Sequence, residues 1–526
     1  MKLYRAFATV GGLTMVSRVL GFVRDILIAA ALGSGAVADA FFVAFRFPNL
    51  FRRLFGEGAF NSAFVPLFAK RLEGEGEAAA RSFAEEAMAG LLLVLVIVSG
   101  LAMLAMPWLM AVLAPGFIAD PAKYDLAVRL TQIAFPYLTC MSLVALLSGV
   151  LNSMHRFWAA AAAPILLNVV LISSITLAIA LGYAERAEAG YVLATGVLLA
   201  GIAQLVMLWW ATKNAGLDLR LVRPRYTPGV KRLVELGIPG LVSGGITQIN
   251  IVVGTIIASL QAGAVSYLYY ADRLYQLPLG IVGVAVGVVL LPDLARRLRA
   301  GDRAAAMDSQ NRSLEFALLL TLPAAVALLV AAEPIIRVLF ERGAFLAADT
   351  PKTAYALMAF AAGLPAFVLI KVFQPAFFAR EDTKTPMYYA GINMAVNVVA
   401  SIAFFFLFQT LGLMPHVGIA LATTLAAWVN AVMLFATLKR HGDFEADQRL
   451  VRNLPLIVLA SLAMGGLVYV LTGWLAPQLS SAATLGVRVT ALAAVVVAGM
   501  IVFAAFIMAT GVLGVAQLKR FTRRRG

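Results

Sequence analysis

Arginine recurs inside the first two apolar segments of the chain, where a charged side chain is least expected. These segments contain Arg18, Arg24, Arg46, Arg52 and Arg53. One charged side chain at the centre of a membrane helix costs roughly 2.5–3.5 kcal/mol on insertion scales. We therefore expect these side chains to be kept from lipid in a wet cavity, and a cationic cavity favours an anionic substrate that crosses the membrane. Guanidinium groups bind phosphate oxygens through paired hydrogen bonds, so several of them suit a diphosphate, although the sequence alone does not separate diphosphate from carboxylate.

The charges of the second segment fall on helical stripes. Asp39 and Arg53 lie on one stripe with Arg46, because the three are spaced by seven residues. Glu57 follows Arg53 by four residues, which is ion-pair spacing on a helix. An adjacent stripe holds Asn49 and Arg52.

Further charges interrupt later apolar segments at Asp272, Arg273 and Lys371. We expect Asp25 and Asp272 to orient the neighbouring arginines rather than to contact a substrate. Cations then outnumber anions in the interior, so the charges do not all pair off. The candidate substrate-binding residues are Arg18, Arg24, Asp39, Arg52, Arg53, Arg273 and Lys371. The candidate supporting residues are Asp25, Asn49, Glu57 and Asp272.

The composition is that of a polytopic membrane protein. The chain has 526 residues, of which 62% are hydrophobic and 13% charged, and its mean hydropathy is +0.90. Soluble domains carry about 25% charged residues. The formal net charge is +15, but the basic residues are separated by apolar runs and are typical of topology signals, so we expect no nucleic-acid partner.

About fourteen apolar segments are long enough to span a membrane, which predicts an all-α fold. Lys and Arg concentrate in the connections that follow even-numbered segments, and the positive-inside rule then places both termini in the cytoplasm. The expected spans are 7–32, 36–68, 80–113, 124–154, 158–182, 188–212, 229–261, 264–295, 307–333, 350–379, 385–411, 416–438, 450–475 and 482–516.

An internal repeat divides these segments into two lobes. Pro66-Leu-Phe-Ala-Lys-Arg-Leu72 returns as Pro292-Asp-Leu-Ala-Arg-Arg-Leu298, at the ends of segments two and eight. The unit therefore holds six segments, and because six is even the two copies form a parallel repeat. The predicted organisation is an amino-terminal lobe (1–216), a basic cytoplasmic linker (217–232), a carboxy-terminal lobe (233–441), and a final helix pair with a basic tail (442–526). We expect the linker to dock on anionic lipid heads.

Signatures of catalysis are not found in the sequence. It has no phosphate-binding loop of the G-x-x-x-x-G-K-[ST] type, no nucleophile triad, and no histidines at metal-ligand spacing. We therefore expect a transporter rather than an enzyme, with no cofactor and no metal site.

Several motifs together resemble the MurJ (MviN) family of the multidrug/oligosaccharidyl-lipid/polysaccharide exporter superfamily. They are Ser17-Arg18-Val-Leu-Gly-Phe-Val-Arg24-Asp25, Asp39-Ala-Phe-Phe-Val-Ala, Pro48-Asn49-Leu-Phe-Arg52-Arg53, Gly56-Glu57-Gly58-Ala59-Phe60 and Tyr269-Tyr-Ala-Asp272-Arg273-Leu. The resemblance covers essentially the whole chain. It implies a flippase that moves lipid II, the undecaprenyl-diphosphate-linked peptidoglycan precursor, from the inner to the outer leaflet of the bacterial cytoplasmic membrane.

The resemblance also implies site residues and partners. Family positions needed for function match Arg18, Arg24, Asp39, Arg52 and Arg273, and those at Arg53, Glu57 and Lys371 extend the set. The final helix pair is expected to frame a groove for the lipid tail, and cell-wall synthesis or division proteins are possible partners. Some members bind sodium through aspartates of segments seven, eleven and twelve. In that region this sequence offers Asn250, Asn393, Asn397 and Thr424 and no aspartate, so a sodium site is not predicted.

The mechanism expected from these features is alternating access through a central cationic cavity, coupled to the membrane potential or to a monovalent cation. Three alternatives stay open. One is a flippase for another prenyl-diphosphate-linked oligosaccharide, and another is a drug/cation antiporter of the same superfamily, which needs cavity carboxylates in excess of arginines. The third is a nontransporting scaffold in the cell-wall machinery, which would tolerate the loss of Arg18 or Arg273.

Overall fold

The computed structural model describes the chain over residues 2–52 and 60–512, apart from the side chains of 2–8, 51–52, 60–62, 239–247, 281 and 283–289. Within these residues the fold is all-helical, as the sequence predicts, and no strand occurs. Ten helical segments of the described chain are long and apolar enough to cross a membrane. They coincide with ten of the fourteen expected spans. The other four expected spans correspond to α1, to α2 with α3, to α10 and to α11, so the count of fourteen stays a prediction.

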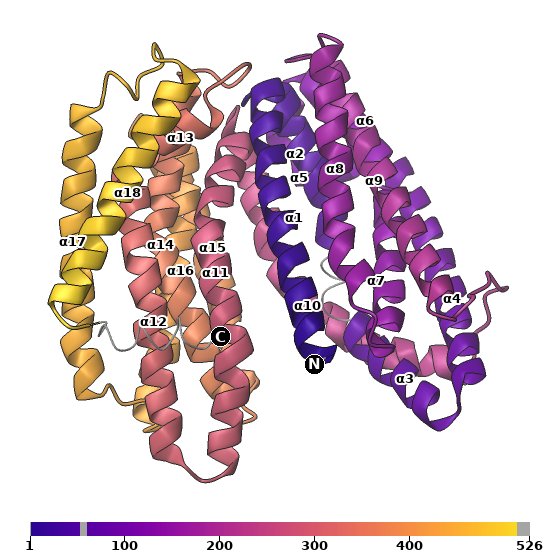
Figure 1. The fold of residues 1–526 in the computed structure, drawn as a ribbon. Coiled ribbons are helices and arrows are strands. Elements are labelled where there is room, and N and C mark those ends of the chain that lie inside the picture. Colours follow the sequence, from indigo (N-terminus) through magenta and orange to yellow (C-terminus); the bar gives the residue numbers. More distant parts are fainter. Residues whose placement is uncertain (1, 53–59, 513–526) are drawn as a thin grey trace. The chain divides into compact units, whose positions relative to one another are not determined.

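The helices group into two compact units (Figure 1), each described here by itself. Unit 1 comprises Met1–Ser266 with Arg342–Phe345, and unit 2 comprises Tyr267–Glu341 with Leu346–Gly526. This grouping follows contacts and does not test the lobe boundaries that the repeat predicts. The helices of unit 1 are α1 (Lys2–Leu32), α2 (Ala36–Arg52), α3 (Phe60–Gly74), α4 (Glu77–Leu104), α5 (Met106–Leu113), η2 (Pro115–Ala119), α6 (Pro121–Ala134), α7 (Tyr137–Ser153), α8 (Trp158–Ala180), α9 (Ala187–Asn214) and α10 (Pro228–Ser259).

Unit 2 begins within the first turn of α11, since Ser266 belongs to unit 1 and Tyr267 to unit 2. Its helices are α11 (Ala264–Arg299), α12 (Arg303–Val330), α13 (Ala332–Phe340), α14 (Asp349–Phe378), α15 (Lys384–Thr410), α16 (Pro415–Arg440), α17 (Gln448–Trp474) and α18 (Leu485–Ala509).

The expected segments 80–113 and 124–154 are each broken into two helices at a proline. The segment 80–113 divides at Ala105 into α4 and α5, with Pro107 in the first turn of α5. The segment 124–154 divides before Tyr137, where Pro136 precedes α7. Proline lacks the amide hydrogen that a continuous helix needs, and it favours the first turn of a new helix.

Side-chain caps start several helices at positions that the sequence marks. Asp120, Thr227, Asp302 and Asp447 each accept a hydrogen bond from a backbone N–H of the turn that follows. These bonds satisfy amide groups that have no partner inside the helix. They fix where α6, α10, α12 and α17 begin, and so set the register of the side chains along each helix.

Small residues let neighbouring helices of unit 2 approach closely. A Cβ atom added at Gly363 of α14 would lie 2.5 Å from Thr424 Oγ1 of α16, and one added at Gly418 of α16 would lie 2.8 Å from the Phe404 backbone of α15. Thr424 Oγ1 also donates to the carbonyl of Ala359 at 2.7 Å. Because lipid is as apolar as leucine, membrane helices associate through such close packing and interhelical hydrogen bonds.

The final helix pair, α17 and α18, lies side by side at one edge of unit 2 (Figure 1). On α17, Gly465 faces Val326 of α12 and Asn453 Nδ2 donates to the buried Glu315 of α12 at 2.6 Å. On α18, Arg488 pairs with Glu341, which follows α13, at 3.4 Å. The outward faces of the pair carry exposed apolar side chains, among them Val470 and Ile501. A surface of this kind is suited to lipid rather than to water.

Candidate functional site

Arg24 of α1 is buried in unit 1 and held on two sides. Its Nε and Nη2 donate to Asp25 Oδ1 at 3.0 and 2.7 Å, and its Nη1 donates to Asn168 Oδ1 of α8 at 2.9 Å. Asp25 is 2% exposed, so its charge offsets that of Arg24 locally. The contact agrees with the expectation that Asp25 orients a neighbouring arginine.

Asn168 fixes this part of α1 against α8. Its Nδ2 donates to the Ser17 carbonyl at 2.9 Å while its Oδ1 accepts from Arg24. The amide packs against Gly21, where an added Cβ atom would lie 3.5 Å from Asn168 Nδ2, an ordinary van der Waals contact. One amide therefore bridges both the backbone and a functional side chain of α1.

Arg18 is placed differently from Arg24. Its side chain is exposed, and within the described residues it makes no ion pair or side-chain hydrogen bond. The two arginines thus differ in electrostatic state: Arg24 is desolvated and paired, and Arg18 is available to an anion.

Asp39 lies in the first turn of α2 and is fully buried, at 0% exposure. Lys123 Nζ of α6 contacts its Oδ2 at 2.7 Å, and the amide of Gly263 donates to the same oxygen at 2.9 Å. Its Oδ1 accepts from the amide and hydroxyl of Ser266 at 3.0 and 2.7 Å. The carboxylate therefore caps the start of α11, where free N–H groups and the helix dipole favour an anion.

Lys123 is itself enclosed. Its Nζ lies 4.0 Å from the centroid of the Phe117 ring, and the residue is 7% exposed. A cation and an anion buried together in this way neutralise each other in a site of low dielectric. These contacts give Asp39 a positioning role; the predicted contact with substrate stays a prediction.

The remaining predicted residues of the second segment are only partly described. Arg46 is half-buried and its Nη1 donates to Thr255 Oγ1 of α10 at 2.9 Å, while Asn49 is also half-buried. Arg52 is the last residue of α2, but the structure does not describe its side chain. Arg53 and Glu57 lie outside the described residues.

In unit 2, Arg273 of α11 is half-buried and its guanidinium lies over the ring of Tyr269, with 4.6 Å from Cζ to the centroid. Its Nη2 also donates to the Tyr269 hydroxyl at 3.0 Å. Asp272 accepts a hydrogen bond from Gln276, and the expectation that it orients Arg273 stays a prediction. The contacts of Arg273 with Tyr269 and of Asp272 with Gln276 each join residues four apart, which share a helix face.

Lys371 of α14 is exposed and, within the described residues, has no ion pair or side-chain hydrogen bond. Two of the polar residues in the region where no sodium site is predicted contact protein groups. Asn397 Oδ1 accepts from Ser401 at 3.1 Å, and Thr424 Oγ1 donates to the Ala359 carbonyl at 2.7 Å. Among the described residues, no group of three or more His, Cys, Asp or Glu side chains is arranged to hold a metal ion.

A model of the family described as "Lipid II flippase MurJ" matches residues 28–484 of the chain. The chain belongs to the MurJ family of lipid II flippases. The resemblance inferred from the motifs is thereby confirmed.

Several MurJ relatives align over nearly their whole length. A protein of Rhizobium meliloti described as a probable lipid II flippase MurJ is 50% identical over 525 residues, covering 100% of this chain and 97% of the relative. The lipid II flippase MurJ of Burkholderia cenocepacia is 34% identical, with 89% and 90% of the two chains covered.

Solved structures give the same family and a wider fold class. A lipid II flippase MurJ in an inward closed conformation matches with a TM-score of 0.76 and 26% identity, covering 94% of this chain and 97% of the other. An inward-facing multidrug transporter of the MATE family matches with a TM-score of 0.64 at 13% identity, covering 82% and 97%. The second match shows a shared fold alone.

The structure adds a motif of the MurJ repeat that the sequence analysis missed. Ala119-Asp120-Pro-Ala-Lys123 begins α6, and Ala348-Asp349-Thr-Pro-Lys352 begins α14, 229 residues later by the difference of their numbers (349 − 120). Lys123 reaches Asp39 in the first turn of α2, and Lys352 Nζ lies 3.2 Å from the hydroxyl of Tyr267 in the first turn of α11. Equivalent lysines thus reach equivalent helix starts in the two units, which supports the parallel repeat.

Unit 2 builds its version of this contact without an acidic residue at the position of Asp39. The Tyr267 hydroxyl donates to Asp349 Oδ1 at 3.0 Å, and the ring of the fully buried His416 lies 5.2 Å from the Tyr267 ring between centroids. The Tyr267 hydroxyl therefore links Lys352 to Asp349, an aspartate of the lysine's own helix. The signal in the sequence is the Asp-x-x-Lys spacing repeated at the starts of two segments.

Proposed function

We propose that this protein carries lipid II from the inner to the outer leaflet of the cytoplasmic membrane by alternating access. The observation that carries the proposal is the family match over residues 28–484. It is supported by cations retained on helices of both units, at Arg18 and Arg24 of α1, Arg273 of α11 and Lys371 of α14.

In this proposal the diphosphate is captured by arginines in different states. Arg18 is exposed and meets the anion first, and the half-buried Arg273 is already oriented by Tyr269. Arg24 begins paired with Asp25, so its part is to exchange that carboxylate for a phosphate oxygen, or to hold α1 in place through Asn168. A planar guanidinium that binds two oxygens at once gives direction as well as charge to such an exchange.

The same proposal assigns the other predicted residues. Lys371 and Arg52 extend the cationic path, with Arg53 and Glu57 beside it, and Asp39 fixes the start of α11. Both termini lie in the cytoplasm, and cell-wall synthesis or division proteins are the partners that a lipid II carrier would serve.

The test is replacement of single cations in cells depleted of the native protein. Arg18→Ala and Arg273→Ala should abolish growth at normal expression and leave newly made lipid II inaccessible to a probe added outside. Arg296→Ala is the matched control, because Arg296 is exposed and pairs with Asp293 at the end of α11. Normal growth and normal outer-leaflet lipid II in both variants would refute the transport role and favour a scaffold.

A further inference from the structure

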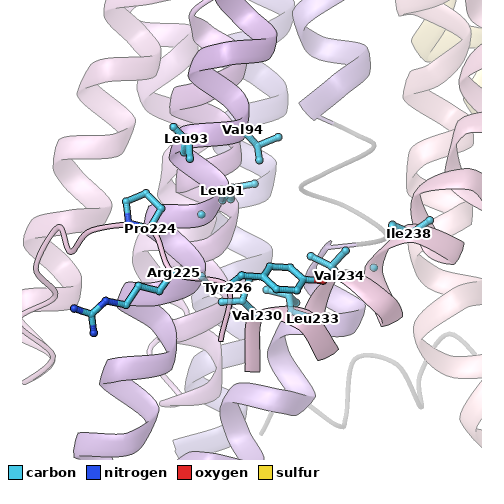
Figure 2. A pocket seen from close by; sticks show the side chains of 13 residues that line it. Leu91, Leu93, Val94, Pro224, Arg225, Tyr226, Val230, Leu233, Val234 and Ile238 are labelled. Carbon is cyan, nitrogen blue, oxygen red and sulfur yellow. The ribbon is translucent and has the colours of Figure 1, made fainter. Parts of the chain in front are cut away.

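Unit 1 contains an apolar pocket that the residues assigned to lipid II do not line. Its volume is about 450 Å³, within the range of roughly 300–1,000 Å³ typical of small-ligand sites. Figure 2 shows its three walls: α4 between Ala87 and Val94, the linker from Pro224 to Tyr226, and the first turns of α10 from Val230 to Ile238. Leu93 and Val94 are 47% and 55% exposed, so the α4 wall is open to the surroundings.

The linker wall is fixed to α4 by two adjacent glutamates. Glu85 Oε1 accepts from the amide of Arg220 at 2.9 Å, and Glu86 Oε2 accepts from the Thr227 hydroxyl at 2.8 Å. Thr227 also caps α10. The stretch between these two bonds is therefore held across α4 at both ends, and the pocket beneath it is a defined feature of the fold.

Charge is concentrated at the rim of the pocket. Residues 217–232 contain five cations, Arg220, Arg223, Arg225, Lys231 and Arg232, and one anion, Asp218. Arg223 and Arg225 are exposed, and no ion pair or side-chain hydrogen bond joins either to another described residue. In Figure 2 the guanidinium of Arg225 extends away from the apolar side chains that line the pocket. An apolar interior beside exposed cations that pair with no described residue matches an amphiphile with an anionic head.

We propose that the pocket holds one acyl chain of an anionic phospholipid of the bilayer, with the lipid phosphate at Arg223 and Arg225. Basic residues near a membrane surface bind anionic heads through charge, and the buried chain adds the apolar contribution. A lipid that is carried across the membrane needs cations on the spanning helices along its path, as on α1 and α11. Cations on a linker between spans hold a phosphate at one face of the membrane, which suits a lipid that stays bound rather than the transported substrate.

The pocket can be filled without displacing protein atoms. A Cβ atom added at Gly237 has nothing within 4 Å, and one added at Gly90 first meets Val230 Cγ1 at 4.0 Å. Gly237→Leu therefore directs a side chain into the space meant for the acyl chain, and Gly90→Leu does so from α4. Gly254→Leu is the matched control, because Gly254 lies on α10 outside the pocket and its added Cβ also has nothing within 4 Å.

The full-length protein is purified in detergent and titrated with phosphatidylglycerol or phosphatidylcholine of the same acyl chains, and bound lipids are counted by native mass spectrometry. Wild type and Gly254→Leu should retain one tightly bound phosphatidylglycerol, which Gly237→Leu and Gly90→Leu lose. Replacing Arg223 and Arg225 together with glutamine should weaken phosphatidylglycerol binding roughly thirtyfold and leave phosphatidylcholine binding unchanged.

Three results would overturn the proposal: full retention of phosphatidylglycerol in both filled variants, no preference for it over phosphatidylcholine in the wild type, or loss of lipid II binding in Gly237→Leu with phosphatidylglycerol retained. The last would assign the pocket to the substrate tail. Gel filtration of each variant confirms folding. The measurement of bound lipid does not depend on flipping. A failure of this lipid-binding proposal can therefore be distinguished from a failure of the proposed transport function.

Discussion

At the residue scale, the structure separates exposed cations from charges that are buried within the fold. Arg18 and Lys371 are exposed and make no described contact of their own, whereas Arg24, Asp25 and Asp39 are buried in defined sets of hydrogen bonds. Asp39 is the extreme case, because both of its oxygens are used inside unit 1. Loss of a residue of this second kind is expected to affect stability together with transport.

Removing one partner of the Lys123–Asp39 ion pair should destabilise the protein, whereas replacing both partners should be tolerated. Lys123→Met leaves a buried carboxylate without its cation, which costs about 3–5 kcal/mol for pairs of this kind. The double variant Lys123→Met with Asp39→Asn keeps acceptors and donors near the α11 start without a net charge, and should recover most of the lost thermal stability. The measurement is the midpoint of thermal unfolding of the detergent-purified protein.

Asp125→Asn serves as the control for this pair, because Asp125 lies on α6 and is exposed. Its unfolding midpoint should equal that of the wild type. Equal midpoints for Lys123→Met and the wild type would show that the pair does not stabilise unit 1.

At the element scale, helix positions are set by caps at the ends and by small residues along the shared faces. The Asp-x-x-Lys turns that begin α6 and α14 each place a lysine against the first turn of a neighbouring helix. The same local sequence therefore makes an equivalent contact between helices in both units. Glycines such as Gly363 then allow the helices that follow to pack closely.

Gly363→Ala should destabilise unit 2, because the added Cβ atom would lie 2.5 Å from Thr424 Oγ1 and 3.0 Å from the Phe367 ring. Overpacking of this kind costs roughly 1–3 kcal/mol. Gly391→Ala of α15 is the matched substitution, since nothing lies within 4 Å of its added Cβ atom, and alanine is the better helix former. The midpoint of thermal unfolding should therefore fall for Gly363→Ala only. Equal midpoints for the two variants would contradict close packing of α14 against α16.

At the scale of the whole molecule, the cations on spanning helices couple transport to the membrane potential in our proposal. A cationic site that returns empty toward a negative interior gains about 2.3 kcal/mol per elementary charge for each 100 mV that it crosses. Depolarising cells or vesicles should therefore slow the appearance of lipid II in the outer leaflet.

The control for depolarisation is an ionophore that collapses only the proton gradient at constant potential. Lipid II translocation that continues unchanged after depolarisation would exclude this coupling and leave a monovalent cation as the alternative.

Much of the protein could be predicted from its sequence because membrane segments are local. Ten expected spans are found as apolar helices, and the motifs around Arg18, Asp39 and Arg273 were sufficient to place the chain in the MurJ family. The repeat was visible for the same reason, since Pro66–Leu72 and Pro292–Leu298 end equivalent segments. Hydropathy, charge and spacing are properties of neighbouring residues, and they need no tertiary contact to be read.

Which charge meets which partner was decided only by the tertiary structure. Lys123 and Asp39 are 84 residues apart, and Arg24 and Asn168 are 144 apart, so nothing in the local pattern joins them. Chain proximity fixes the helix on which a side chain stands, but the direction of that side chain and the group it contacts depend on how helices pack.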